Sequence, residues 1–357
     1  MRGASPAVQS FKNKNRALKS STSVYALLMT EQNLKNQPPE AAQKSPAIFL
    51  MGPTASGKSR LALAIAGQLP VEIVSVDSAQ VYRYMDIGTA KPGVEALAVA
   101  PHHLINLIDP DQRYSAAEFL RDALRAMDEI TQRGNIPLLV GGTMLYFKTL
   151  LDGLSLLPPA NRSLRIAIEA KAEEKGWPAM HEELALLDPA SAARIKPTDS
   201  QRVQRALEIR YLTGRPMSEI LGKPAPVHFP YHAIKIALIP SDRSLLHERI
   251  THRFNEMLKL GLSDEVRAIR DKFWLNDGNP SMRCVGYRQM LMYLDEKIDA
   301  LTARQKALAA TRQLAKRQLT WLRSMGGLHE FDCLAENLPE QVCNYLSNAS
   351  LNSAVVS

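Results

Sequence analysis

One segment of the sequence has the residue types and spacing of a phosphate-binding loop, G-x-x-x-x-G-K-[ST]. The segment consists of Gly52, Pro53, Thr54, Ala55, Ser56, Gly57, Lys58 and Ser59. Its small residues let backbone N–H groups wrap a phosphate, and a helix that begins here adds positive potential. Lys58 supplies a mobile cation, and the hydroxyl of Ser59 can bind Mg²⁺. The loop therefore predicts a bound di- or triphosphate, without specifying which compound or which bond breaks.

Asp77 is a second group that could do chemistry, because it ends the apolar run 71–77 and is followed by polar residues. At the end of a parallel strand, its carboxylate would lie beside the phosphate loop. There it could hold Mg²⁺ through water, or it could take a proton from a nucleophile as a general base. It could also simply cap a following helix. The polar segment 85–92, which contains Gly88 and Lys91, is typical of a loop over a substrate.

The elements that must position these groups alternate between short apolar strands and amphipathic helices. Strands are predicted at 47–51, 71–77, 136–140 and, with less apolar character, 102–109, and helices at 60–69 and 115–133, the latter with Ser115 as N-cap. This alternation predicts an α/β fold with a P-loop NTPase-like parallel sheet, whose ligands bind at the carboxyl ends of the strands.

The chain divides into five segments around this core. We expect a disordered N-terminal extension (1–45), the first part of the P-loop core (46–154), a helical insertion domain (155–230), a return strand with C-terminal helices (231–330) and a tail (331–357). The extension is polar and lacks periodicity, whereas prolines interrupt helical stretches throughout the insertion. Within the fourth segment, a strand is predicted at 234–240 and helices at 241–260, 262–273, 281–295 and 301–324.

Composition and charge exclude several classes of protein. Hydrophobic residues make up 45% and charged residues 22%, which excludes wholesale disorder, and no apolar run is long enough to span a membrane. The net charge of +8 is concentrated in residues 1–30 and 283–323. Such basic segments attract phosphate polymers or acidic membranes, although a solvated basic face would look the same. The three cysteines fit a reduced compartment, and the three tryptophans are predicted to be core residues.

Five stretches together resemble the bacterial tRNA dimethylallyltransferase family. They are GPTASGKS (52–59), VDSAQVYRYMDIGTAKP (76–92), LLVGGTMLYFKTLL (138–151), RCVGYRQM (283–290) and ATRQLAKRQLTWLR (310–323). The resemblance runs from about Ala47 to Leu328 in the family's order. The N-terminal extension is atypical, and Ser59 stands where many relatives have Thr, which keeps the hydroxyl.

The resemblance implies transfer of a dimethylallyl group from dimethylallyl diphosphate to N6 of the adenosine directly 3′ of the anticodon, in tRNAs that read codons beginning with U. Diphosphate would leave, with Mg²⁺ as cofactor near Ser59. By position in the family's motifs, Asp77 is the expected catalytic base, Lys58 and Arg253 hold the diphosphate, and Thr143, like Thr54, contacts substrate. Arg249 is a less secure helper.

The resemblance also implies an insertion domain that contacts tRNA and a set of residues that bind the anticodon loop. The expected tRNA-binding residues are Asp77, Ser78, Ala79, Gln80, Thr143, Arg165, Gln201, Arg202, Val203, Gln204, Arg205, Arg283, Cys284, Val285, Gly286, Tyr287, Arg288, Lys316, Arg317, Gln318, Leu319, Thr320, Trp321, Leu322 and Arg323. Helical arithmetic places Arg312, Lys316 and Arg323 within about 40° of one another, as a basic stripe.

Other functions remain open from the sequence. A P-loop small-molecule kinase would share the phosphate loop and a nearby acid, but it would not account for the basic C-terminal helices. An isopentenyltransferase acting on free adenine nucleotides is closer in chemistry, and an RNA-binding ATPase switch without a covalent product is a third class. Cys333 and Cys343 lack zinc-finger spacing. We expect a cytoplasmic, monomeric protein that does not bind membranes.

Overall fold

The computed structural model describes residues 44–154, 157–221 and 229–354 of the 357-residue chain. The predicted disordered extension, 1–45, lies outside the described residues except for its last two positions. The described residues from Ser45 onward form one compact unit. In the part of the chain that is described, no helix has both the length and the apolar character needed to cross a membrane.

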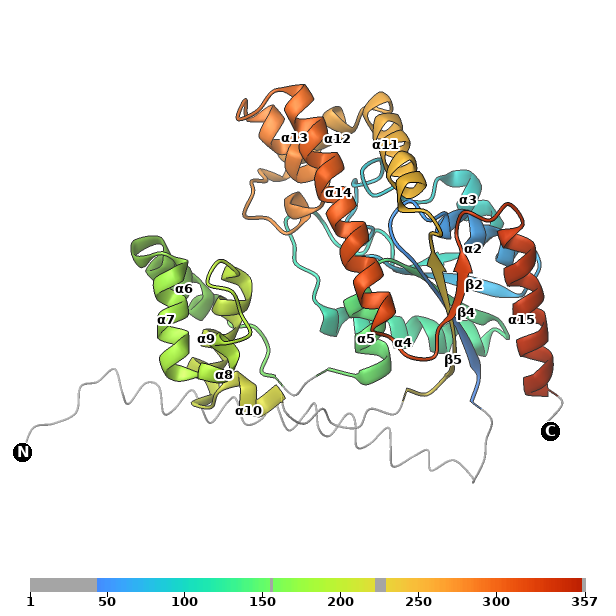
Figure 1. Cartoon of the computed structure of the whole chain (residues 1–357), viewed down its shortest axis with the longest axis horizontal. Coiled ribbons are helices and arrows are strands. Elements are labelled where there is room, and N and C mark those ends of the chain that lie inside the picture. The colour runs from blue at the N-terminus through green and yellow to red at the C-terminus, as the bar shows by residue number, and fades with distance from the viewer. Residues whose placement is uncertain (1–43, 155–156, 222–228, 355–357) are drawn as a thin grey trace, which may run out of the picture. The chain divides into compact units, whose positions relative to one another are not determined.

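The described residues contain a parallel sheet of six strands in the order β3-β2-β4-β1-β5-β6 (Figure 1). The strands are β1 (Pro46–Met51), β2 (Val71–Val76), β3 (His102–His103), β4 (Ile136–Gly141), β5 (His232–Ile239) and β6 (His329–Asp332). The parallel α/β prediction is confirmed. The strand predicted over 102–109 is much shorter, because Leu104 and Asn106 take left-handed backbone conformations (φ 61° and 55°) that end the strand.

Helices connect the first strands. They are α2 (Lys58–Ala66), α3 (Val94–Val99), α4 (Ala116–Gln132) and α5 (Met144–Asp152). The predicted N-cap of α4 is confirmed as a capping box: the Ser115 hydroxyl accepts from the Glu118 N–H at 3.2 Å, and the Glu118 carboxylate accepts from the Ser115 N–H at 2.7 Å. This cap fixes where α4 begins against the sheet.

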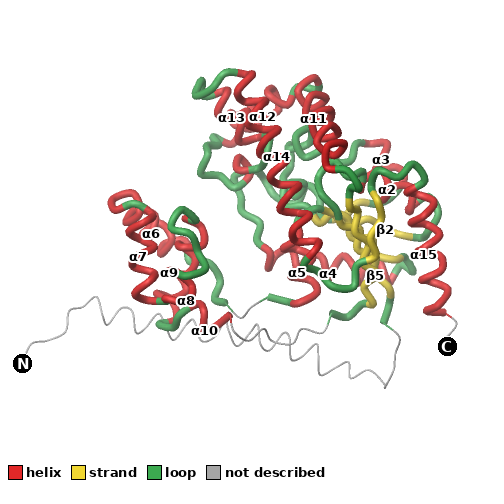
Figure 2. The backbone as a smooth tube through the Cα atoms, viewed as in Figure 1, coloured by secondary structure: helices red, strands yellow, loops and turns green. Residues whose placement is uncertain are grey.

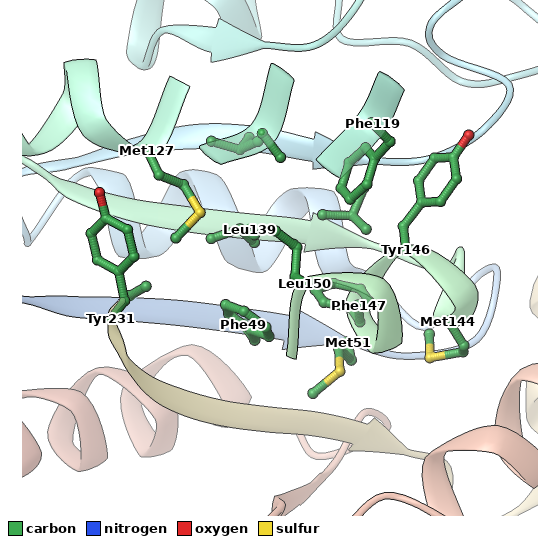
Figure 3. Close-up of a cluster of buried hydrophobic side chains, with 14 of the residues drawn as sticks. Phe49, Met51, Phe119, Met127, Leu139, Met144, Tyr146, Phe147, Leu150 and Tyr231 are labelled. Atoms are coloured by element: carbon green, nitrogen blue, oxygen red, sulfur yellow. The ribbon is translucent and has the colours of Figure 1, made fainter. Parts of the chain in front are cut away.

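The hydrophobic core lies on both faces of the sheet because successive residues of β1 point to opposite sides. Phe49 and Met51 pack on one face with Phe119 of α4 and Phe147 of α5 (Figure 3). Leu50, on the opposite face, belongs to a second cluster that includes Leu61 of α2. Both faces of the central strands are therefore buried, and only their carboxyl ends are left to meet a ligand.

The predicted insertion is helical in its described residues. It contains α6 (Arg162–Lys175), α7 (Trp177–Leu187), α8 (Pro189–Ala192), α9 (Ser200–Thr213) and α10 (Met217–Leu221). These helices have a hydrophobic cluster of their own, with Ile168, Leu184, Val203 and Leu207 at its centre. The insertion is thus built around a separate core, as a domain would be.

The C-terminal helices follow β5 and share a third cluster. They are α11 (Arg243–Lys259), α12 (Leu262–Phe273), the 3₁₀ turn η1 (Ser281–Arg283), α13 (Tyr287–Leu294) and α14 (Ala300–Arg323). The helix predicted over 281–295 is split, because the backbone of Cys284 is extended and Gly286 takes a φ of 95°. The split leaves residues 284–286 as a short connection between η1 and α13.

In its described residues, the segment predicted as a tail (331–357) is part of the core. It holds the end of β6 and the helix α15 (Leu338–Ala354), and both lie against the rest of the sheet layer in the tube view (Figure 2). Phe331, Leu338 and Val342 are buried in the same cluster as Leu50. The prediction of a tail was wrong because β6 is short and half exposed, so its sequence carries little periodicity.

Candidate active site

The phosphate loop, Asp77 and Thr143 follow three neighbouring strands of the sheet. The strand order β2-β4-β1 is contiguous and parallel, so residues that follow these strands meet at one edge. Gly141 makes the close approach possible, since a Cβ built on it would lie 2.0 Å from the carbonyl oxygen of Val76. The fold therefore brings together the three groups that the sequence predicted as a site.

Thr143 links the ends of β4 and β2. Its Oγ1 accepts from the backbone N–H of Ser78 at 3.0 Å, and its own N–H donates to the carbonyl oxygen of Val76 at 3.2 Å. Next to this link, Oδ1 of Asp77 accepts from the N–H of Ala79 at 2.8 Å. Residues 78–81 form a turn rather than a helix, so the carboxylate of Asp77 caps no helix.

Two cations lie at the phosphate loop. Nζ of Lys58 donates to the carbonyl oxygens of Gly52 at 2.9 Å and Pro53 at 2.6 Å. Nη1 of Arg253, from α11, donates to Oγ1 of Thr54 at 3.3 Å. Burial and the charge of Arg253 together lower the pKa of Lys58 to about 7, while Asp77 acts in the opposite direction. Burial likewise lowers the pKa of Arg253. Two desolvated cations at the same loop favour the binding of an anion there.

A cavity of about 600 Å³ extends from Thr54 and Ala55 of the phosphate loop to an apolar wall. Thr54, Asp77, Thr143 and Arg253 line its polar side. The apolar side consists of Tyr82, Ile250, Phe254, Met257, Cys284 and Tyr287. Burial raises the pKa of the Cys284 thiol to about 12, so this side chain contributes a neutral surface. The arrangement suits a ligand with a charged head and an apolar tail.

The protein offers few ligands for a divalent cation here. Ser59 lies in the first turn of α2, and Asp77 is the one carboxylate that lines the cavity among the described residues. Nowhere in the described part of the chain do three or more His, Cys, Asp or Glu side chains gather as a metal site would require. A Mg²⁺ ion at this site would therefore take most of its oxygen ligands from phosphate and water.

Several of the residues predicted to bind tRNA come together in the structure. Arg283, Val285 and Gly286 line the active-site cavity, as do Arg317 and Trp321 of α14. A second cavity of about 1100 Å³ is lined by Gln201 at the start of α9 together with Arg283, Arg288 and Arg317. Other members of the predicted set are exposed beside these: Ser78, Arg202, Lys316, Thr320 and Arg323.

Other members of the set point into the interior. Val203, Leu319 and Leu322 are buried core residues, and Tyr287 is buried where it forms part of the apolar wall of the active-site cavity. Gln80 is also occupied within the protein, where its Oε1 accepts from the hydroxyl of Ser75 at 2.8 Å. These contacts stabilise the elements that carry the site.

Two arginines of the insertion that are predicted to bind RNA form ion pairs within the insertion. The carboxylate of Glu208 is buried, and it accepts from Nε and Nη2 of Arg165 at 3.0 Å and from Nη1 of Arg205 at 2.6 Å. Gln204, between them in sequence, donates to the carbonyl oxygen of Arg165 and to the carboxylate of Glu169. These contacts hold α6 against α9.

A network that fixes the loop 86–91 has no counterpart among the predictions from the sequence. Glu265 of α12 accepts from the backbone N–H groups of Asp86 and Ile87 at 3.0 and 2.7 Å. The ammonium of Lys91 is nearly buried and donates to the carboxylate of Asp86 and the carbonyl oxygen of Tyr82 at 2.7 Å each. Lys91 lies in a recognisable motif, but Glu265 has no local signal that could have revealed its role.

Two other predictions fail. Arg249 donates to the carbonyl oxygen of Cys333 at 2.9 Å, so it holds the C-terminal segment rather than the phosphate loop. Trp274 is 90% exposed and Trp321 is 38% exposed, although their type predicts core residues. Trp274 takes a left-handed backbone conformation at the end of α12, which turns the ring away from the cluster that its helix neighbours join.

The chain is similar in sequence to known enzymes. The chain is 70% identical over 312 residues to a tRNA dimethylallyltransferase of Nitrosospira multiformis, covering 87% of this chain and 97% of the relative. It is 60% identical to the enzyme of that name from Nitrosomonas europaea, covering 87% and 98%.

Solved structures are similar as well. The crystal structure of a tRNA isopentenylpyrophosphate transferase from Bacillus halodurans matches with a TM-score of 0.65 and 34% identity, over 88% of this chain and 99% of that one. A eukaryotic dimethylallyltransferase acting on tRNA matches with a TM-score of 0.68 and 28% identity, over 81% and 74%. Residues 80–325 match the family described as IPP transferase. From the sequence match, the shared fold and the cavity at the ends of β1, β2 and β4, the chain belongs to the IPP transferase family.

Proposed function

We propose that this protein transfers a dimethylallyl group from dimethylallyl diphosphate to N6 of the adenosine directly 3′ of the anticodon, in tRNAs that read codons beginning with U. The observation that carries the proposal is a single cavity lined by Thr54 and Ala55 of the phosphate loop, by one carboxylate (Asp77) and by apolar residues of α11.

The diphosphate is the leaving group in this reaction. When the bond between C1 of the allyl group and the diphosphate oxygen breaks, negative charge grows on the diphosphate. Lys58 and Arg253 lie at the loop where this charge develops, and Lys58 must move from the carbonyl oxygens of Gly52 and Pro53 to meet it. Because both cations are already desolvated, their attraction to the leaving group is stronger than it would be in water.

Asp77 is the proposed base. The exocyclic amine of adenine is a weak nucleophile, so the new carbon–nitrogen bond forms as a proton leaves N6. The hydrogen bond from Ala79 engages one oxygen of the Asp77 carboxylate, and the Thr143–Ser78 link fixes the turn that carries it. A carboxylate held in this way can receive the proton without first reorganising.

The apolar wall provides a place for the dimethylallyl tail. Ile250, Phe254 and Met257 are spaced three or four residues apart on α11, on the face that also carries Arg253. One helix therefore offers a cation to the diphosphate and apolar side chains to the tail. A site without water also protects an allylic cation-like transition state from hydrolysis.

The RNA is proposed to enter from the side where Arg283 and Arg317 line the cavity. A base in the anticodon loop is stacked, so the target adenosine must turn out of the loop to reach Asp77. We further propose that Mg²⁺ accompanies the diphosphate, near Ser59, where it would neutralise charge. The protein is proposed to act as a monomer in the cytoplasm, with no role for membranes.

A transfer assay tests the function. Purified protein is incubated with Mg²⁺, labelled dimethylallyl diphosphate and an unmodified anticodon stem-loop, beside the same stem-loop with guanosine at the target position. Label on the first RNA but not the second supports the proposal. Label on free AMP alone would reassign the protein to adenine nucleotides. Label on neither acceptor would contradict prenyl transfer.

A further inference from the structure

Gln318 of α14 joins two loops of the active site. Its side-chain oxygen accepts from the backbone N–H of Thr54 at 2.8 Å, and its side-chain nitrogen donates to the carbonyl oxygen of Gly142 at 2.9 Å. Thr54 belongs to the phosphate loop after β1, and Gly142 belongs to the loop after β4. One amide group thus connects two loops that are 264 and 176 residues away in sequence.

The surroundings of Gln318 hold its side-chain amide in place. Gln318 is 7% exposed, and its neighbours Ala315, Leu319 and Leu322 are buried against the core. The glycine at 142 leaves the space that the amide fills, because a Cβ there would lie 2.3 Å from Nε2 of Gln318. A buried amide whose oxygen and nitrogen both have backbone partners is a rigid connection.

The connection lies between the two halves of the catalytic machinery. On one side, Oγ1 of Thr54 accepts a hydrogen bond from Nη1 of Arg253 at 3.3 Å. On the other, Gly142 precedes Thr143, whose hydroxyl oxygen accepts from the N–H of Ser78 beside Asp77. The amide therefore sets the distance between the loop that holds the diphosphate and the turn that carries the proposed base.

The same helix presents cations to solvent around Gln318. Lys316, Arg317 and Arg323 are exposed, and Arg317 lines the active-site cavity. Gln318 belongs to the segment predicted to contact RNA, yet its side chain points inward to the two loops. A shift of α14 on RNA binding would therefore move both loops through the hydrogen bonds of this one side chain.

We propose that Gln318 is a positioning residue that holds the phosphate loop and the Gly142–Thr143 loop in register and couples both to α14. RNA bound on α14 and diphosphate bound at the phosphate loop would then strengthen each other's binding, because such coupling is reciprocal. The coupling to RNA rests on the proposed function, whereas the positioning of the two loops does not.

Binding measurements with three single variants test the proposal. Gln318→Met keeps the length of the side chain but makes neither hydrogen bond. Gly142→Ala adds a methyl group that displaces the side-chain amide of Gln318, so it disturbs the same contact from the other partner. Gln313→Met is the matched control, because Gln313 is exposed on the same helix. Inorganic diphosphate with Mg²⁺ is titrated calorimetrically into each protein, with and without a saturating anticodon stem-loop, and stem-loop affinity is measured by fluorescence anisotropy.

We expect Gln318→Met and Gly142→Ala each to weaken diphosphate binding about tenfold, from lost and unsatisfied buried hydrogen bonds. Stem-loop affinity without diphosphate should stay within about twofold, since neither change touches the exposed cations. The stem-loop should strengthen diphosphate binding in the wild type and in Gln313→Met, and this strengthening should disappear in the other two variants.

The double variant Gln318→Met/Gly142→Ala separates positioning from a general loss of stability. If both changes break one contact, the double variant should bind diphosphate no worse than either single variant. Additive losses, or unchanged diphosphate affinity in folded Gln318→Met, would overturn the proposal. A wild-type protein that binds diphosphate and RNA with no coupling would overturn the link to α14. Failure to transfer the prenyl group, with these binding results intact, would contradict the proposed function alone.

Discussion

The hydroxyl oxygen of Thr143 accepts a hydrogen bond from the backbone N–H of Ser78 at 3.0 Å, although 65 residues separate them in sequence. The contact joins the residue after β4 to the turn after β2. Asp77 directly precedes Ser78. The side chain of Thr143, after β4, therefore fixes the backbone that carries the carboxylate of Asp77, after β2. Much of the rate acceleration that a general base provides depends on its precise placement.

Replacement of Thr143 should therefore lower the rate of transfer through Asp77. Thr143→Val keeps the shape but removes the acceptor, and we expect the single-turnover rate to fall about tenfold or more. Thr143→Ser keeps the acceptor and should retain most of the rate. Rapid-quench kinetics with saturating substrates measure both. Equal rates for the two variants would show that the hydroxyl does not position the turn.

Asp77→Asn should abolish transfer while leaving the protein folded. The amide oxygen can still accept from the Ala79 N–H, so the turn is retained, but the side chain can no longer take a proton. We expect a loss of roughly 10²-fold to 10⁴-fold in the single-turnover rate, the range of general base catalysis. Stem-loop affinity should change little. A comparable loss of RNA affinity would mean that Asp77 binds RNA rather than acting as a base.

Diphosphate binding should depend on pH through Lys58. Burial and Arg253 lower the pKa of this ammonium to about 7, so above pH 7 the free protein holds it neutral. A bound anion favours the charged form and raises this pKa, so binding at pH 8 should take up a proton, and affinity should fall as pH rises past 7.

Calorimetry in two buffers of different ionisation enthalpy measures that proton uptake. Lys58→Arg is the control, because its guanidinium stays charged throughout, and the protons released by the diphosphate itself are common to both proteins. The wild type should take up more protons than Lys58→Arg at pH 8. Identical uptake would show that Lys58 is already charged in the free protein.

Glu208→Gln should destabilise the helical insertion. The change leaves Arg165 and Arg205 without the buried carboxylate that joins α6 to α9, and breaking one partner of a buried ion pair costs about 3 kcal/mol. Urea unfolding followed by circular dichroism measures the loss. Glu174→Gln, an exposed change on α6, should have little effect.

The contribution of Glu208 should also depend on pH. Burial raises the pKa of its carboxyl, but the hydrogen bonds from Arg165 and Arg205 outweigh burial and lower it overall. A lowered native pKa gives stability above the unfolded value of about 4.3, and this stability is lost as pH falls below it. The difference in unfolding free energy between wild type and Glu208→Gln should therefore shrink under acid conditions. A constant difference would contradict a charged Glu208.

Lys316→Ala should weaken stem-loop binding and reduce its salt dependence. Each phosphate contact releases about one counterion, so the slope of log affinity against log salt should fall by roughly 0.7 to 1. Lys306→Ala is the matched control, because Lys306 lies ten residues earlier on the same helix and is also exposed. Anisotropy titrations over a range of salt concentrations measure both. An unchanged slope for Lys316→Ala would remove this residue from the interface.

The sequence by itself determined the local parts of the site. The phosphate loop, the strand that precedes Asp77 and the capped start of α4 all follow from turn chemistry and periodicity over a few residues, and each is present in the structure. The parallel sheet follows too, because alternating strands and helices allow few other arrangements. The five motifs together also point to the family that the family match confirms.

The tertiary structure alone decided which side of each motif faces the ligand. Within the segment 316–323, Lys316 and Arg323 face solvent, Leu319 and Leu322 face the core, and Gln318 meets the phosphate loop. Residues that are consecutive in a motif point in different directions on a helix, so a motif cannot assign one role to all of them. Such contacts depend on how distant elements pack together, and no local pattern in the sequence records that packing.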